Sequence, residues 1–173
     1  MWPARWPNSW LRAEVRQMPS LLLRSTSPEL MACRLDAPDR AAVISALADR
    51  LAEVDPGVDS EQIQRVALAR EEIESTAIGD GVALPHARTD GVAAIRLCVA
   101  TLARPVDWAA FDGVGVQAVF LIMGSRRAPA QQLRVLADVS GLLRSGGLRD
   151  ELLAAADAAA LYAAIRSAST RKA

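Results

Sequence analysis

Two long apolar runs set the tightest limit on the fold of this 173-residue chain. Residues 92–103 are apolar almost continuously, and residues 116–123 repeat the pattern with β-branched and aromatic members. Runs of this kind are typical of strands that are covered on both faces, whereas a half-exposed strand alternates apolar and polar residues. The two runs therefore predict two central strands of a buried sheet.

Helical patterns surround these two strands. A start signal at Asp36 and Pro38 precedes a set of apolar residues at spacings of four and three, which predicts a helix near residues 38–53. The residues that share its expected buried face are Val43, Leu47, Leu51 and Val54.

A second helix is predicted to begin at Asp59, because Gln62 follows three positions later as in a capping box. Its expected buried face consists of Ile63, Val66, Ala67 and Ile73.

A third helical face precedes Gly146 and Gly147, and the alanine-rich segment 148–166 continues as one or two more helices. The residues of this third face are Leu133, Leu136, Ala137, Ser140 and Leu143. Together these patterns predict an α/β fold, with a mixed central sheet flanked by helices on both faces.

The first 17 residues differ in composition from the rest of the chain, because they hold three of its four tryptophans. Trp2, Trp6 and Trp10 recur every four residues, but Pro3 and Pro7 interrupt any helix there. We expect residues 1–17 to form a loose extension, with Met18 as a natural start, and residues 18–173 to form one domain. An arm that touches a membrane or a partner is the alternative.

Charge and cysteine content exclude several classes of function. Twenty acidic residues balance 20 basic ones, and no basic stripe with interleaved aromatics occurs, so we expect no nucleic-acid partner. No apolar stretch is long enough for a membrane span, which predicts a cytoplasmic protein without membrane insertion. Cys33 and Cys98 lack metal-type spacing, and only one histidine is present. We therefore expect no metal or other cofactor, and two buried free thiols.

That single histidine, His86, lies in the segment GDGVALPHARTD, residues 79–90. Gly79 and Gly81 permit positive φ, and Pro85 fixes the chain just before the imidazole. A neutral imidazole offers one ring nitrogen as a nucleophile while a hydrogen bond fixes the other.

The stretch of chain around this histidine, residues 70–88, also holds residue types that bind phosphoryl oxygens. These are Arg70, Thr76 and Arg88. These parts fit phosphoryl transfer. The alternatives are an acid–base site or a plain surface histidine.

The stretch REEIESTAIGDGVALPHAR resembles the signature of the type-2 enzyme IIA domain of the phosphoenolpyruvate:sugar phosphotransferase system, in its fructose, mannitol and nitrogen-regulatory branch. The similarity extends from about residue 20 to residue 165, and it includes VDWAAFDGVGVQAVFLIM. The resemblance implies that His86 accepts a phosphoryl group, with Arg70 and Thr76 beside it in the phosphate site. Arg88 is a further expected phosphate ligand.

The chain departs from the family pattern at two positions. Ala77 replaces a usual glycine, which the loop tolerates if φ there is negative. Gln132 stands where many relatives have a second histidine near the acceptor. A glutamine can donate a hydrogen bond to phosphate but cannot change its charge, so we expect altered transfer rates and an unaltered acceptor.

The resemblance also implies partners. An HPr-like phosphocarrier protein would donate the phosphoryl group, and a IIB component or a regulatory target protein would receive it or respond to it. Arg126 and Arg127 are expected near the docking face. The alternative is an interaction module that binds its partners irrespective of phosphorylation.

Overall fold

The computed structural model describes residues 20–171. The predicted extension, residues 1–17, lies outside the described residues, so its looseness stays a prediction. The helices of the described part are α2 (Leu21–Arg24), η1 (Pro28–Leu30), α3 (Arg40–Val54), α4 (Ser60–Ile73), α5 (Pro129–Arg144), α6 (Leu148–Ala154) and α7 (Ala158–Arg171). The strands are β1 (Met31–Leu35), β2 (Ala77–Gly79), β3 (Val82–Ala83), β4 (His86–Thr89), β5 (Arg96–Val106) and β6 (Val116–Ser125).

The six strands form one mixed sheet in the order β1-β5-β6-β3-β2, with β4 also paired to β6. β5 and β6 are antiparallel, whereas β1 runs parallel to β5, and β3 and β4 run parallel to β6. The predicted α/β fold with a mixed central sheet is confirmed, and both apolar runs lie in its central strands.

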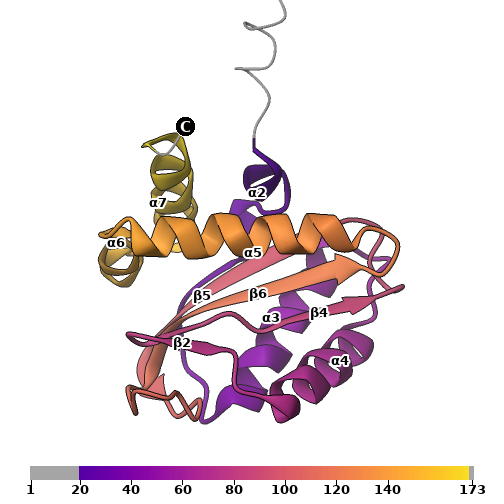
Figure 1. The fold of residues 1–173 in the computed structure, drawn as a ribbon, viewed down its shortest axis with the longest axis horizontal. Helices are drawn as coiled ribbons and strands as arrows, with labels where there is room; N and C mark the ends of the chain where they lie inside the picture. Colours follow the sequence, from indigo (N-terminus) through magenta and orange to yellow (C-terminus); the bar gives the residue numbers. More distant parts are fainter. Residues whose placement is uncertain (1–19, 172–173) are drawn as a thin grey trace, which may run out of the picture.

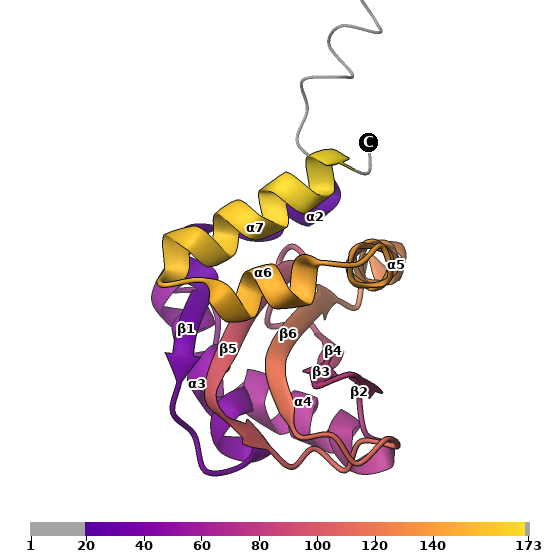
Figure 2. The same cartoon turned by 90° about the vertical axis from the view of Figure 1, so that its left-hand side faces the viewer.

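Helices cover both faces of the sheet, as the sequence predicts. α3 and α4 lie on one face, and α2, α5, α6 and α7 lie on the other (Figures 1 and 2). Each face has its own apolar core, and side chains of β5 and β6 contribute to both. The two central strands read as continuous apolar runs because each of their faces is buried.

The boundaries of the elements differ slightly from the predicted ones. β5 begins at Arg96 rather than near residue 92, because residues 90 and 91 form a turn, although Val92 itself is buried in the core. In α3 the N-cap is Asp39, whose carboxylate accepts a hydrogen bond from the N–H of Ala42 at 2.8 Å. Asp59 caps α4 as predicted, because its carboxylate accepts from the backbone N–H groups of Glu61 and Gln62.

The prediction that Ile73 is buried is wrong, since 80% of this side chain is exposed. Ile73 is the last residue of α4, and the helix turns Glu71 rather than Ile73 into the interior. Val54, the last residue of α3, is likewise exposed.

The helix face predicted for α5 is not its most buried face, although Leu136 and Leu143 pack against the edge of the core. The buried apolar residues of α5 are Val135, Val139 and Leu142, whereas Leu133 is 68% exposed. Leu136 and Leu143 are only half-buried, so the leucine stripe lies beside the core-facing side of the helix. Leu133 and Leu136 border one of the cavities described below, and Leu143 borders the other.

The two cysteines are free, as predicted, but only Cys98 is fully buried. Cys33 on β1 is half-buried and its thiol donates to the carbonyl oxygen of Ala155. None of the helices between residues 20 and 171 combines the length and apolar character that crossing a bilayer requires.

Candidate functional site

His86 is positioned by a break in a strand. β3 ends at Ala83, Leu84 and Pro85 interrupt the pairing, and β4 begins at His86. The carbonyl oxygen of Pro85 accepts a hydrogen bond of 2.9 Å from the N–H of Ile122 on β6, which holds the break against the centre of the sheet. His86 is thereby presented, half-buried, at the start of β4.

The imidazole makes one hydrogen bond with the described part of the chain, and this bond fixes its tautomer. Nδ1 of His86 lies 2.8 Å from the carbonyl oxygen of Leu84. A carbonyl oxygen can only accept, so Nδ1 carries the proton. In the neutral ring the lone pair is then on Nε2.

Both glycines of the preceding loop have the positive φ that the sequence predicts, +91° at Gly79 and +71° at Gly81. Ala77 lies in β2 and is not among the residues with positive φ, so its replacement of a glycine imposes no backbone strain.

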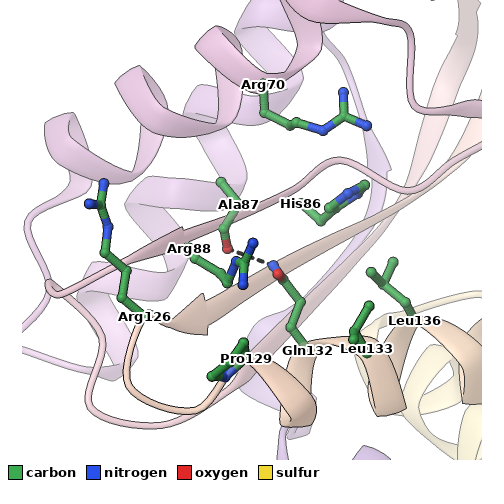
Figure 3. Close-up of a pocket in the computed structure, with 9 residues that line it drawn as sticks. All are labelled: Arg70, His86, Ala87, Arg88, Arg126, Pro129, Gln132, Leu133 and Leu136. Atoms are coloured by element: carbon green, nitrogen blue, oxygen red, sulfur yellow. Dashed lines mark hydrogen bonds between the residues drawn. The ribbon is translucent and has the colours of Figure 1, made fainter.

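A cavity of about 570 Å³ opens beside His86 (Figure 3). It lies between α4, β4 and the first half of α5. The residues that line it are Arg70, His86, Ala87, Arg88, Arg126, Pro129, Gln132, Leu133 and Leu136.

Three arginines from three separate elements give this cavity its charge. Arg70 comes from α4, Arg88 from β4, and Arg126 from the turn after β6. Within residues 20–171 none of the three forms an ion pair, and no acidic side chain lines the cavity. Nη1 of Arg70 donates to the carbonyl oxygen of Glu74 at 3.0 Å, which anchors this guanidinium at the end of its helix. The cavity is therefore suited to an anion.

The N-terminus of α5 adds to this positive potential. α5 has 16 residues and begins with Pro129, and its N-cap residue Ala128 makes no side-chain capping bond. The N-terminal turn of a helix carries a partial positive charge, which favours a nearby anion. Pro129 and Gln132 of this turn border the cavity.

Gln132 lines the cavity as predicted, but its amide nitrogen is engaged elsewhere. The side chain is 5% exposed, and Nε2 donates to the carbonyl oxygen of Ala87 at 2.7 Å (Figure 3). Nε2 also lies 3.4 Å from the carbonyl oxygen of Ile122, to which it donates a longer hydrogen bond. Gly124 of β6 leaves room for this approach, since a Cβ there would lie 3.1 Å from Cβ of Gln132. Gln132 therefore ties α5 to the main chain beside His86.

Thr76 does not line the cavity. Its hydroxyl donates to one carboxylate oxygen of Glu71 at 2.5 Å, and its backbone N–H donates to the other oxygen at 2.8 Å. Glu71 and Thr76 are both buried, so this pair closes the loop between α4 and β2. The phosphate-binding role expected for Thr76 stays a prediction.

The structure thus brings four of the five predicted site residues around one cavity and adds residues that the sequence reasoning placed elsewhere. Arg126 was expected only near a docking face, and Leu133 and Leu136 were expected only as members of an apolar helix face. For Arg126, the available signal in the sequence was a loop arginine shortly before a helix that starts at Pro129. Among residues 20–171 no cluster of three or more His, Cys, Asp or Glu side chains has the arrangement of a metal site.

Comparison with known proteins identifies the family. A family model described as the phosphoenolpyruvate-dependent sugar phosphotransferase system, EIIA 2, matches residues 25–168. A nitrogen regulatory protein from Bradyrhizobium diazoefficiens is 33% identical over 139 residues, which cover 80% of this chain and 90% of that protein.

Solved structures share the fold. The nitrogen regulatory protein IIA-Ntr from Neisseria meningitidis superimposes with a TM-score of 0.77 at 23% identity, over 84% of this chain and 99% of that one. The mannitol enzyme IIA from Escherichia coli, in its complex with phosphorylated enzyme IIB, gives a TM-score of 0.69 at 16% identity, over 82% and 97% of the two chains. The family model covers the arginine-lined cavity and its histidine, and the chain belongs to the EIIA type-2 family of the phosphoenolpyruvate-dependent sugar phosphotransferase system.

Proposed function

We propose that this protein is a phosphoryl carrier and that Nε2 of His86 is its acceptor atom. The observation that carries the proposal is the hydrogen bond from Nδ1 to the Leu84 carbonyl, which leaves the lone pair on Nε2. The three arginines of the adjoining cavity, which form no ion pair among residues 20–171, support it, because they supply the charge that a phosphoryl group requires. We infer that Arg70, Arg88 and Arg126 hold this group and that Thr76 keeps the preceding loop in place.

The transfer needs no proton movement at His86. The N–P bond of a phosphorylated HPr-like donor breaks, and its electron pair returns to the donor nitrogen. The lone pair of Nε2 forms the new N–P bond. The proton stays on Nδ1, where the Leu84 carbonyl stabilises the positive charge that the ring acquires. Catalysis of this step is mainly positioning and charge stabilisation, which the fixed ring and the arginines provide.

The phosphorylated protein would act in the cytoplasm in one of two ways. It would pass its phosphoryl group to a IIB component, or its phosphorylation state would regulate a target protein. The relative from Bradyrhizobium, matched over 90% of its length, is a nitrogen regulatory protein, which favours regulation. The Escherichia coli complex supports a IIB partner, since that enzyme IIA has a similar fold and binds phosphorylated enzyme IIB.

Incubation with phosphoenolpyruvate, enzyme I and HPr tests the proposal. We expect one acid-labile, alkali-stable phosphoryl group per molecule by intact mass spectrometry, and phosphorus–proton NMR should place it on Nε2. Phosphate on Nδ1 would contradict the tautomer argument. A protein that binds its partners equally well but takes up no phosphate would support the interaction-module alternative instead.

Gln132 should slow onward transfer. We expect slow handover from the natural protein to a IIB domain of the same organism, because Nε2 of Gln132 already donates to main-chain carbonyl oxygens. Handover from Gln132→His should be about tenfold faster, because a protonated histidine would add a charged hydrogen bond to the phosphoryl group. Rapid-quench transfer measures both rates. Gln131→His is the matched control, since Gln131 is exposed and does not line the cavity. Fast transfer by the natural protein, unchanged in Gln132→His, would favour sugar uptake over regulation.

A further inference from the structure

A second cavity, of about 480 Å³, adjoins the C-terminal half of α5. Ser140, Leu143 and Arg144 of α5 line one side of it, the β2–β3 turn lines another, and Arg149 of α6 completes it. Figure 1 shows β2 and α6 at the same end of the molecule as the C-terminus of α5. No residue lines both this cavity and the one beside His86. We propose that this second cavity binds a small molecule that has an oxyanion group, carboxylate or phosphate, attached to an apolar body.

Two arginines provide the oxyanion-binding side. Arg144 is exposed and forms no ion pair within the described part of the chain. Arg149 pairs through Nη1 with Asp150 at 3.0 Å, but that carboxylate is largely exposed and such a pair is weak. Nη2 of Arg149 makes no hydrogen bond among the described residues, whereas its Nε is unpartnered but buried and so out of a ligand's reach. Guanidinium groups with unused donors favour a ligand that brings acceptor oxygens.

Apolar side chains provide the other side. Val82 is buried, Leu143 is half-buried, and Ile78 is an exposed large hydrophobic residue at the rim. An inorganic ion would leave this apolar surface in water, whereas an alkyl or aryl group would cover it. This lining is the reason for the apolar body in the proposed ligand.

Gly79 lines the cavity, and Gly81 brings the β2–β3 turn close to the rest of the molecule. A Cβ on Gly81 would lie 3.5 Å from Nη2 of Arg149 and 3.2 Å from the carbonyl oxygen of Gly115, so the turn packs closely against α6 and the segment before β6. Asp80, between the two glycines, is the one acidic residue in the lining. Its charge partly offsets the two arginines and makes it a useful position for a test.

NMR titration of the ¹⁵N-labelled full chain tests the proposal. Hexyl phosphate and hexanoate are the probes, and hexanol, which lacks the oxyanion, is the control. We expect both probes to shift the backbone amides of Gly79, Asp80 and Arg149 saturably, and hexanol to shift them little. Shifts confined to His86 and Arg88, or equal shifts with hexanol, would overturn the proposal.

Three variants sharpen the test. Arg149→Gln should weaken hexyl phosphate binding about tenfold or more, the loss expected for a charge-assisted hydrogen bond. Asp80→Asn should tighten it, and asparagine suits the positive φ of this position. Arg134→Gln is the control. Arg134 also lies on α5, but it pairs with Asp138 and lines neither cavity. Equal affinities in the natural protein, Arg149→Gln and Asp80→Asn would contradict the site, whatever the outcome of phosphorylation at His86.

Discussion

A His86→Ala protein should take up no acid-labile phosphate from phosphoenolpyruvate, enzyme I and HPr. The chain has no second histidine to replace the lost acceptor, and the arginines around the cavity cannot form the N–P bond of a carrier. Because binding and charge stabilisation remain while the nucleophile is gone, we expect complete loss of labelling rather than a reduced rate. Radiolabelling and intact mass spectrometry measure the outcome.

The control for this experiment is to show that the His86→Ala protein is still folded. His86 is half-buried, and among residues 20–171 its ring makes one hydrogen bond, to the carbonyl oxygen of Leu84. Loss of that bond should change the melting temperature by only a few degrees. A folded His86→Ala protein that still acquires acid-labile phosphate would show that the acceptor lies elsewhere.

The second large effect is expected at alkaline pH and originates at Cys98, near the beginning of β5. Burial raises the pKa of this thiol from its ordinary value of 9.0 to about 12, against a smaller opposing effect of Arg50 and Arg96. In the unfolded chain the thiol loses its proton near pH 9, while in the folded chain it stays neutral until about pH 12. The stabilisation is therefore complete below pH 9 and is lost as the pH rises towards 12, by up to about 4 kcal/mol.

Urea unfolding under reducing conditions between pH 8 and pH 11 measures this loss. The basic residues are arginines apart from Lys172, so few other side chains change charge in this range. Cys98→Ala should be less stable than the natural protein at pH 8 but much less sensitive to alkali. Cys33→Ala should keep the natural sensitivity, because Cys33 is only half-buried. An equally steep fall in Cys98→Ala would exclude this thiol as the cause.

The sheet could be predicted from the sequence because β5 and β6 are buried on both faces, and strands of this kind consist of continuous apolar runs. The site could be predicted in part, because His86 and Arg88 are neighbours in the chain and Pro85 and the two glycines mark the turn before them. Arg70 stood out as a residue type that binds phosphoryl oxygens, but only the resemblance implied its place beside the histidine. Contacts of this kind across the fold have no signal in the local pattern of residues.

α5 shows why the remainder could not be predicted. Its core-facing residues Val135, Val139 and Leu142 and its leucine stripe both follow helical spacing. Periodicity identifies an apolar face, but it does not tell whether that face meets the sheet or borders a cavity. Leu133 and Leu136 border the cavity beside His86, so a surface that serves the site has the same sequence pattern as a core.

Glu71 is a charged residue whose burial the sequence pattern does not indicate. A charged residue near the end of an amphipathic helix is normally assigned to the solvent side, yet Glu71 is buried because both of its oxygens accept hydrogen bonds from Thr76. That pairing depends on how the chain leaves α4. The helical pattern of the sequence does not contain this information.

The break in the strand before His86 has a consequence for how mutations are tolerated. The group that fixes the imidazole is a main-chain carbonyl, that of Leu84, and every amino acid at position 84 supplies one. Substitution of a side chain cannot delete this partner; it can only displace it. Deep mutational scanning should therefore find that acceptor function survives most changes at Leu84 that preserve the core, and that tolerance falls sharply at Pro85, which sets the backbone path between the carbonyl and the ring.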